Sequence, residues 1–406
     1  MPAESGSHSD SGAEASSTDD GRTSRRGFLT TATGATVAAL AGCMSGPSGD
    51  GSGGGGGETT ESGGTETGTG TTTGSSSKRY AGQTLSVATW AGIYAEAFEK
   101  TVAKSFEEKT GATVEVNPAG GSIISEIKSA PADDPPYDVA AAEGFFYWQG
   151  RNEDLFLEVR EENVPNLDGV YDYLTDLRGT KYGVPTDGSL EGIIYRDDVG
   201  WDPSTWMDLL SDKDGTGRIG FEGSWYIYPF EVASVSLDTA PGIQELYDPD
   251  QHQAIFDRMR TFGQNVELWT GSFAEIESSL RQGIIDMSMW YSGMGNAAAS
   301  DTDSLKWTTP SKTAGYLDLY CPVRGTDERD MAEDFLDHML DPQVQSEWAS
   351  EGYVYTSNEN VTYPDRVADQ YPTSSSEWES IKIANFTELS EYSSKLSSEF
   401  QEIKRA

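Results

Sequence analysis

The sequence predicts an α/β protein, and three observations support this prediction. After Tyr80 the chain alternates between short apolar runs and amphipathic stretches, the pattern of strands and helices in α/β architecture. A length of 406 residues exceeds one small domain and favours two once any tails are removed. Hydrophobic residues make up 36% of the chain and aromatic residues 11%, so a sizeable core can form and wholesale disorder is excluded.

The first predicted elements are a strand at Leu85–Thr89, a helix at Tyr94–Thr110 and a strand at Ala112–Val116. Gly111 closes the helix, because glycine readily adopts the left-handed conformation that ends helices. Short apolar runs bounded by turn residues predict further strands. These strands are Asp138–Ala142, Tyr182–Val184, Gly192–Tyr195, Arg218–Phe221 and Val266–Trp269.

Residues Ser272–Gln282 form the clearest predicted helix. Phe273, Ile276 and Leu280 fall on one helical face, and Gly283 ends the pattern. The remaining predicted elements are strands at Ile284–Trp290 and Tyr316–Cys321 and helices near Arg329–Leu340, Pro342–Glu351 and Leu389–Ile403. The sequence contains no internal repeat.

The chain is strongly acidic, with 67 Asp and Glu against 28 Lys and Arg and a formal net charge of -39. Such a field repels phosphate backbones, which excludes nucleic acid as a partner and disfavours anionic membrane surfaces. At molar salt the Debye length falls to about 3 Å and the self-repulsion is screened. The composition therefore favours a halophilic, haloarchaeal source. Any single acidic residue is most simply part of a solvated face.

Cysteine and histidine are scarce, at two and three residues. These numbers exclude a disulfide framework, a four-cysteine zinc site and a His-rich metal centre. We therefore expect no metal and no cofactor. His252 and His338 are expected at the surface or as helix caps, and Cys321 is expected to be a buried strand residue rather than a nucleophile.

The N-terminal segment carries an export signal. Ser24–Leu29 resembles the twin-arginine signal, and the apolar run that follows, Phe28–Gly42, is too short to span a bilayer permanently. The run ends in Leu40–Cys43, which looks like a lipobox, so residues 1–42 are predicted to be a twin-arginine lipoprotein signal peptide. Cys43 would then carry a lipid that anchors the mature protein at the extracellular face of the membrane.

Residues 43–79 are predicted to be a flexible tether behind the lipidated cysteine. Between Gly46 and Ser77 the chain has 13 Gly, 8 Thr and 6 Ser in 32 residues, and this composition cannot bury apolar surface. Its root-mean-square reach is about 30 Å. Asn360 and Asn385 satisfy the N-glycosylation pattern, and a chance match explains each equally well.

Several fragments, in order, give the chain its resemblance to a known family. The fragments are Leu85–Trp90, Phe106–Gly111, Tyr137–Val139, Lys181–Pro185, Gly192–Tyr195, Trp201–Trp206, Leu280–Gly283, Met289–Trp290, Phe335–Pro342, Gln345 and Gly352–Tyr353. From about Gln83 to about Arg405 the chain resembles extracellular solute-binding proteins of ABC importers, in the branch that contains spermidine/putrescine-binding proteins.

This resemblance implies a two-lobed, periplasmic-binding-protein-like fold with a ligand cleft between the lobes. Residues 80–187 with about 291–345 would form the first lobe, 188–290 the second, and 346–406 C-terminal helices that pack on the lobes. It also implies that Thr186–Glu191 and Trp290–Gly295 lie near hinges.

Candidate binding residues follow the predicted strands, because ligands of open α/β sheets bind beyond the carboxyl ends of the strands. Aromatic faces stack on flat ligands or hold cations, and carboxylates pair with amines. For the aromatic residues the alternative is packing within a lobe, and for the two glutamates it is a solvated strand end or a helix cap. The candidates are Trp90, Glu143, Phe145, Glu222, Trp225, Trp290 and Tyr291.

The resemblance adds Tyr316 and Asp318, which match an aromatic residue and an aspartate beside the last cleft strand of the family. It also supports Trp90 and Trp290, whereas Glu222 only approximates an acidic position of the second lobe. Two departures leave the solute open. Ser292 stands where polyamine binders carry a carboxylate, and Glu143 stands where they show a hydroxyl residue. A cationic or amine-bearing solute is favoured only modestly.

The leading prediction is a monomeric transport binding protein that captures a small solute and delivers it to an ABC permease, with no catalytic residues. One alternative is a surface sensor with the same lobes. Another is an exported hydrolase that uses paired carboxylates such as Glu143 and Glu222. The sequence lacks Gly-x-Ser-x-Gly, His-Glu-x-x-His and Walker-type motifs, which argues against an enzyme.

Overall fold

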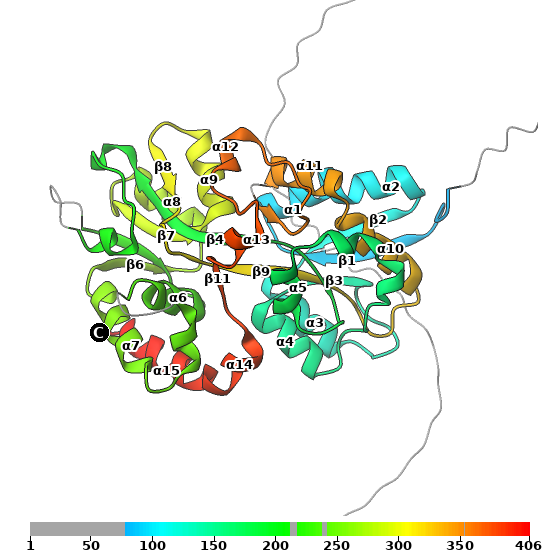
Figure 1. Ribbon diagram of the computed structural model, residues 1–406, viewed down its shortest axis with the longest axis horizontal. Coiled ribbons are helices and arrows are strands. Elements are labelled where there is room, and N and C mark those ends of the chain that lie inside the picture. The colour runs from blue at the N-terminus through cyan, green and yellow to red at the C-terminus, as the bar shows by residue number, and fades with distance from the viewer. Residues whose placement is uncertain (1–77, 212–216, 238–241, 353) are drawn as a thin grey trace, which may run out of the picture. The chain divides into compact units, whose positions relative to one another are not determined.

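The computed structural model describes residues 78–211, 217–237, 242–352 and 354–406, all within one compact unit, residues 73–406. The predicted signal peptide, the lipidated Cys43 and nearly all of the predicted tether lie outside the described residues. The described residues form a mixed α/β fold (Figure 1). The α/β prediction is therefore confirmed. No helix among the described residues is long and apolar enough to cross a membrane.

Eleven strands of the described part of the chain form the sheet, in the order β2-β1-β3-β9-β4-β7-β5-β6. β8 and β10 pair with β4, and β11 pairs with β9. The strands are β1 Thr84–Thr89, β2 Thr113–Pro118, β3 Val139–Glu143, β4 Val184–Arg196, β5 Ile219–Glu222, β6 Val266–Thr270, β7 Met287–Tyr291, β8 Leu305–Thr308, β9 Ala314–Pro322, β10 Tyr355–Thr356 and β11 Lys382–Ile383.

The helices lie between these strands and after them. They are α1 Ile93–Phe98, α2 Lys104–Thr110, α3 Ile123–Ser129, α4 Gly144–Asn152, α5 Asp172–Arg178, α6 Ile227–Val235, α7 His252–Gly263, α8 Phe273–Arg281, α9 Ser292–Asp301, α10 Arg329–Met339, α11 Pro342–Gly352, α12 Asp365–Ala368, α13 Ser375–Trp378, α14 Phe386–Leu389 and α15 Ser393–Ile403. A π-helical turn, Glu99–Ala103, joins α1 to α2. Gly111 ends α2 with φ 79°, as the sequence predicts.

The core is divided between two groups of elements. One apolar cluster gathers around the parallel strands β1, β2 and β3 and the helices α10 and α11, with Leu85 and Phe106 at its centre. Two further clusters gather around β5, β7 and the helices α6 to α8, with Phe230 and Ile276 fully buried. Figure 1 shows the two groups side by side, with β4 and β9 running between them.

β4 is one strand of thirteen residues, where the sequence predicts two short strands. Gly188 and Gly192 interrupt the apolar pattern that identifies a strand. They are required here because neighbouring segments approach the backbone of β4 too closely to leave room for a side chain. A Cβ on Gly188 would lie 2.0 Å from the Tyr316 carbonyl oxygen. The segment Thr186–Glu191 lies within this strand, and its hinge role stays a prediction.

The C-terminal residues pack on both groups. Trp348 of α11 and Trp378 of α13 are buried in the β1–β3 cluster, whereas Leu396 and Phe400 of α15 are buried in the cluster around β5. The sequence predicts one helix over Leu389–Ile403, but a 3-10 turn at Ser390–Tyr392 separates α14 from α15.

The expectation for the two central histidines was wrong. His252 is 1% exposed and His338 is 4% exposed. His252 contacts the Leu246 carbonyl oxygen at 2.9 Å through Nε2, and His338 contacts the Ser105 hydroxyl at 2.8 Å. Each imidazole therefore has a polar contact through Nε2, whereas Nδ1 of His338 has no hydrogen-bond partner. Cys321 of β9 is buried, as expected.

Candidate functional site

The strand ends of the two groups converge on one cavity of about 290 Å³. Its residues come from the ends of β1, β3 and β7, from the turn after β5, from α4 and α6, and from β9. The lining residues are Trp90, Gly121, Glu143, Phe146, Ser224, Trp225, Tyr228, Tyr291 and Tyr316. Trp90 and Phe146 pack against the β1–β3 cluster, whereas Trp225, Tyr228 and Tyr291 pack against the β5 cluster. The cavity therefore lies between the two groups, and we call it the aromatic cavity.

Five predicted site residues line the aromatic cavity: Trp90, Glu143, Trp225, Tyr291 and Tyr316. All four aromatic members are half-buried, and Trp90, Trp225 and Tyr291 pack against core clusters. This arrangement follows from sheet topology, because parallel strands place their carboxyl ends at one edge. Their role in binding stays a prediction.

The aromatic walls hold one another in place. The Tyr228 ring lies 5.1 Å from that of Tyr291 and 5.9 Å from that of Tyr316. Across the cavity, Phe146 stacks on Trp225 with ring centroids 6.2 Å apart and an interplanar angle of 18°. Such ring pairs contribute about 0.5–1.5 kcal/mol beyond their burial, which favours a preformed binding surface.

Phe145 is not among the residues that line the aromatic cavity. Its ring packs instead at 5.3 Å from Trp225, 5.7 Å from Trp148 and 6.0 Å from Phe386. Because Phe145 and Trp148 belong to α4 while Trp225 and Phe386 pack with the β5 cluster, these rings form a contact between the two groups. Phe145 therefore packs outside the aromatic cavity and supports Trp225, which lines it.

Glu143 is the acidic residue of the aromatic cavity, and it is 6% exposed. The Tyr228 hydroxyl donates a hydrogen bond to it, but burial dominates and raises its pKa to about 7. Glu143 is the residue before α4, yet its side chain makes no capping hydrogen bond to that helix. Glu143 therefore occupies the N-cap position without capping the helix through its side chain.

Two more carboxyls lie in register with Glu143 on neighbouring strands. Glu143 pairs with Asp318 of β9, and Asp318 pairs with Asp187 of β4. Asp187 accepts hydrogen bonds from the Thr186 and Tyr94 hydroxyls, at 2.7 and 3.2 Å. Asp318 is 1% exposed, and its Oδ1 has no hydrogen-bond partner.

The electrostatics of this row are unfavourable in the absence of a cation. Burial raises the pKa of Asp187 to about 7. Burial, with the nearby charges of Asp187 and Glu143, raises the pKa of Asp318 well above its usual range. No Lys or Arg of the described residues is hydrogen-bonded or ion-paired to Glu143, Asp187 or Asp318. Like charges in a low-dielectric site favour protonation or a bound cation.

Glu222 and Trp290 occupy predicted positions but face other partners. Glu222 is 2% exposed and accepts hydrogen bonds from the backbone N–H groups of Ser224 and Trp225, at 2.8 and 3.1 Å. Trp290 is 3% exposed and packs in the cluster of Ile276, with its ring 5.7 Å from Phe273. Neither is among the residues that line the aromatic cavity.

Residues 101–373 match the family described as bacterial extracellular solute-binding protein. The chain belongs to this family. Its members are transport proteins rather than enzymes, and their location is extracellular. No curated protein matches the chain.

Solved structures of this solute-binding protein's relatives share its fold. An extracellular solute-binding protein from Bordetella parapertussis is 21% identical, with a TM-score of 0.66, over 79% of this chain and 98% of that chain. The spermidine/putrescine ABC transporter substrate-binding protein PotD from Streptococcus pneumoniae is 16% identical, with a TM-score of 0.66 over 79% and 99%. MotA from A. tumefaciens B6, in complex with glucopine, is 16% identical, with a TM-score of 0.64 over 79% and 100%. The predicted two-lobed fold is thereby confirmed.

Four of the residues that line the aromatic cavity are not predicted from the sequence: Gly121, Phe146, Ser224 and Tyr228. Phe146 and Ser224 are close in sequence to predicted residues, and a wider window after each strand would have included them. Tyr228 lies in α6, whose apolar sequence gives no sign that one side chain faces a cavity. The sequence indicates Asp187 less clearly, because it stands out only as a polar residue in a strand that crosses the core.

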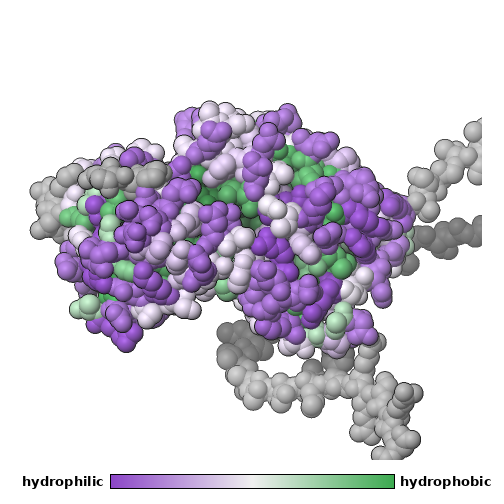
Figure 2. All heavy atoms as spheres, turned by 60° about the horizontal axis from the view of Figure 1, so that its bottom comes forward, coloured by the Kyte–Doolittle hydropathy of each residue, from purple (hydrophilic) through white to green (hydrophobic). Residues whose placement is uncertain are grey.

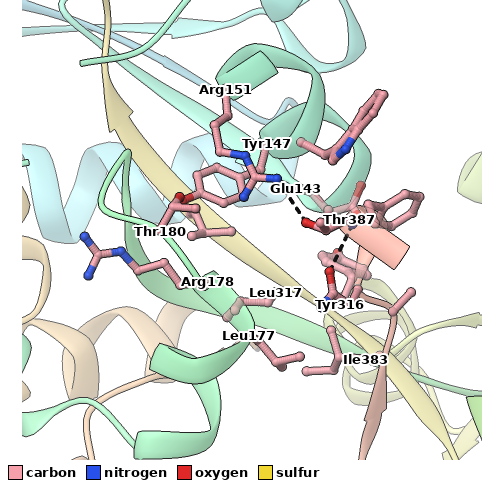
Figure 3. Close-up of a pocket in the computed structure, with 18 of the residues that line it drawn as sticks. Glu143, Tyr147, Arg151, Leu177, Arg178, Thr180, Tyr316, Leu317, Ile383 and Thr387 are labelled. Carbon is pink, nitrogen blue, oxygen red and sulfur yellow. Dashed lines mark hydrogen bonds between the residues drawn. The ribbon is translucent and has the colours of Figure 1, made fainter. Parts of the chain in front are cut away.

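A second cavity, of about 390 Å³, shares Glu143 and Tyr316 with the aromatic cavity (Figure 3). Its remaining walls come from α4, the end of α5 with the turn that follows it (177–180), β9, Glu231 of α6 and the segment 383–387. Arg151 of α4 donates to the Thr387 hydroxyl at 2.9 Å, and the Tyr147 and Thr180 hydroxyls are 2.7 Å apart. We call this space the rear cavity. No group of His, Cys, Asp and Glu within the described residues could hold a metal ion.

Proposed function

We propose that this solute-binding protein captures a small amine-bearing cation and delivers it to an ABC permease. One observation carries the proposal: a row of buried carboxyls without a basic partner reaches, at Glu143, an aromatic cavity between the two lobes. A protonated amine supplies the missing positive charge, and the rings of Trp90, Trp225 and Tyr228 offer faces for the cation and for its carbon chain.

Glu143 is the residue we expect to contact the amine first. It lines the aromatic cavity, and its carboxyl is hydrogen-bonded to one side chain, Tyr228. Asp318 and Asp187 stand behind it in the same row, where they add negative potential rather than a second direct contact. Ser292, at the position where polyamine binders carry a carboxylate, lies 2.9 Å from the Ser189 hydroxyl. Glu143 would therefore replace the acid that is missing there.

Lobe closure would couple binding to transport. Ligand in the aromatic cavity touches Trp90 of one lobe and Trp225 of the other, so its binding free energy favours the arrangement in which both contacts exist. A permease that recognises this arrangement receives the loaded protein. PotD is named as a spermidine/putrescine binder and another similar structure as a GABA receptor, which agrees with an amine. The likeness to both is one of fold, so the carboxyl row remains the main support.

The test is native mass spectrometry of the protein purified from its own host at high salt. We expect a co-purifying mass that corresponds to an amine, with titration calorimetry confirming its affinity. Glu143→Gln should weaken binding of that amine, whereas Glu245→Gln, a buried carboxyl outside both cavities, should leave it unchanged. A co-purifying neutral sugar or anion that binds Glu143→Gln as tightly as the wild type would contradict the proposal.

We further propose that the mature protein is a monomer held at the extracellular face of the membrane by a lipid on Cys43. Cys43→Ser should release it from membranes, because the lipid is the anchor. Arg25→Lys together with Arg26→Lys should keep it unexported. Intact mass of membrane-extracted protein decides the first point, and the absence of a lipid on Cys43 would exclude the anchor.

A further inference from the structure

The acidic end of the rear cavity has no use in the function proposed above. Glu231 of α6 is 2% exposed, and its Oε2 has no hydrogen-bond partner. Burial, with the charge of Glu143, raises the pKa of Glu231 well above its usual range. Both line the rear cavity.

The nearest acid to Glu231 is another buried carboxyl, that of Glu191 in β4. Burial raises the pKa of both carboxyls well above the usual range, and the charge of Glu231 adds to the effect on Glu191. A cation bound beside Glu231 would supply the opposite charge that favours its ionised form.

No ion pair joins the basic residues of the rear cavity to Glu143 or Glu231 within the described residues. Arg151 donates to the Thr387 hydroxyl, at the side of the cavity formed by α4 and α14. Arg178 is ion-paired to Glu161 through Nη1 at 3.0 Å, whereas its Nε and Nη2 have no hydrogen-bond partner. Figure 3 shows its guanidinium directed away from Tyr316 and Leu317. Neither arginine contributes to the raised pKa values of Glu143 and Glu231.

The walls of the rear cavity suit a carbon chain. Leu177, Leu317 and Ile383 line it together with the rings of Tyr147 and Trp148, as Figure 3 shows for the labelled residues. Its volume of about 390 Å³ lies in the range of small-molecule sites. An alkylammonium ion would place its charge at Glu143 and Glu231 and its methylene groups against these apolar walls.

We propose that the rear cavity is a second site for a protonated amine, and that it shares the Glu143 carboxylate with the aromatic cavity. The proposal rests on the proposed function, because both sites use Glu143. The amine has two possible sources: the second ammonium group of one linear diamine, or a separate monoamine. The chemistry of the site is the same for both.

Fluorine NMR of protein labelled with fluorotryptophan separates the two cavities. Trp148 lines the rear cavity and Trp225 lines the aromatic cavity, and Trp→Phe variants assign their resonances. Putrescine and n-butylamine serve as probes in molar KCl. We expect putrescine to shift both resonances. Glu231→Gln should abolish the shift of Trp148, retain that of Trp225 and weaken putrescine binding by about tenfold or more.

The controls keep the result interpretable. Glu245→Gln removes a buried carboxyl outside both cavities and should change neither shift. Thr180→Phe fills the rear cavity from its half-buried wall, so it should abolish the Trp148 shift even if Glu231→Gln does not fold.

Each outcome decides the proposal. If n-butylamine, added without putrescine, shifts both resonances, two separate amines fill the two sites. If putrescine shifts the Trp148 resonance and n-butylamine does not, one diamine spans both sites. Either result supports the second site. A putrescine shift at Trp225 without one at Trp148 overturns the second site and leaves the proposed function intact. The absence of a shift at both residues overturns the two proposals together.

Discussion

Glu143 and Glu222 end equivalent strands in the two halves of the molecule, yet their surroundings differ. Glu143 ends β3 and Glu222 ends β5, and both are almost fully buried. After β5 the chain turns at Gly223 and returns the N–H groups of Ser224 and Trp225 to the Glu222 carboxylate. After β3 it enters α4 at once, and no backbone N–H of that helix bonds the Glu143 side chain.

The turn that follows each strand therefore decides what its terminal acid can do. Glu222 fixes its own turn and thereby positions Ser224 and Trp225 at the aromatic cavity. Glu143 keeps acceptor capacity for a ligand, because Tyr228 is its one side-chain donor within the described part of the chain. The same contrast separates Trp225, half-buried at the cavity, from Trp290, which is 3% exposed in a core cluster.

The largest expected effect comes from the two tryptophans. Trp290→Ala should cost about 3–5 kcal/mol of folding stability, because it leaves a cavity in the cluster of Ile276 and Leu280. Trp225→Ala should cost less stability and reduce ligand affinity by about 5- to 150-fold, equivalent to about 1–3 kcal/mol. Denaturant unfolding and titration calorimetry on both variants test this. A Trp290→Ala protein of wild-type stability and reduced affinity would place Trp290 in the site.

Substitution of the two glutamates should likewise separate an effect on ligand affinity from an effect on folding stability. Glu143→Gln should weaken binding of an amine by about 10-fold or more, since it removes a charged hydrogen-bond acceptor, and should leave the fold intact because an uncompensated buried charge is lost. Glu222→Gln should instead cost about 1–2 kcal/mol of stability through the weakened turn. Equal affinity losses with unchanged stability in both variants would contradict the distinction.

The regular elements of the fold were readable from the sequence. α8 and the end of α2 were predicted closely, because helical periodicity and a terminal glycine are local signals. β4 was divided in two, because Gly188 and Gly192 follow from the close approach of other segments, such as Tyr355 and Trp307. That approach is a property of the tertiary structure and leaves no periodic trace.

The site was predictable as a region but less so as individual residues. Strand ends located the aromatic cavity, but they did not separate Trp290, which packs in a core cluster, from the adjacent Tyr291, which lines the cavity. Which of them meets the cavity depends on how the sheet is covered. The pairing of Glu191 with Glu231 joins residues forty positions apart in the sequence, and no local pattern reveals it.

The effects of pH should be smaller than those of the substitutions above. Folding stability and amine affinity should change in opposite directions as the pH rises. Burial raises the pKa of Glu143 from 4.5 to about 7, so between these values the folded state binds more protons than the unfolded state. This contribution to stability is present below 4.5 and is lost as the pH rises through about 7. Amine affinity should rise over the same window, because the carboxylate form binds the cation.

Glu143→Gln should flatten both dependences in part, since Asp187 titrates in the same window. Glu222→Gln should retain most of them, because hydrogen bonds from Ser224 and Trp225 oppose the effect of burial on Glu222. Melting temperature and calorimetric affinity from pH 5 to pH 8 provide the measurement. A wild-type stability that increases across this range would be incompatible with the assigned protonation of Glu143.

Salt should change the contrast between the two glutamates least of all. Figure 2 shows a face on which hydrophilic residues predominate, and the whole chain carries a net charge of -39. Repulsion among exposed acids acts over a Debye length of about 10 Å at 0.1 M salt and about 3 Å at 1 M. Melting temperature should therefore rise with KCl for the wild type and both glutamine variants together.

Glu143 and Glu222 are buried and little screened, so the difference between their variants should stay nearly constant. A flat or falling melting temperature would contradict the halophilic interpretation of the composition, and a contrast that disappears in molar KCl would mean that Glu143 is a solvated surface acid.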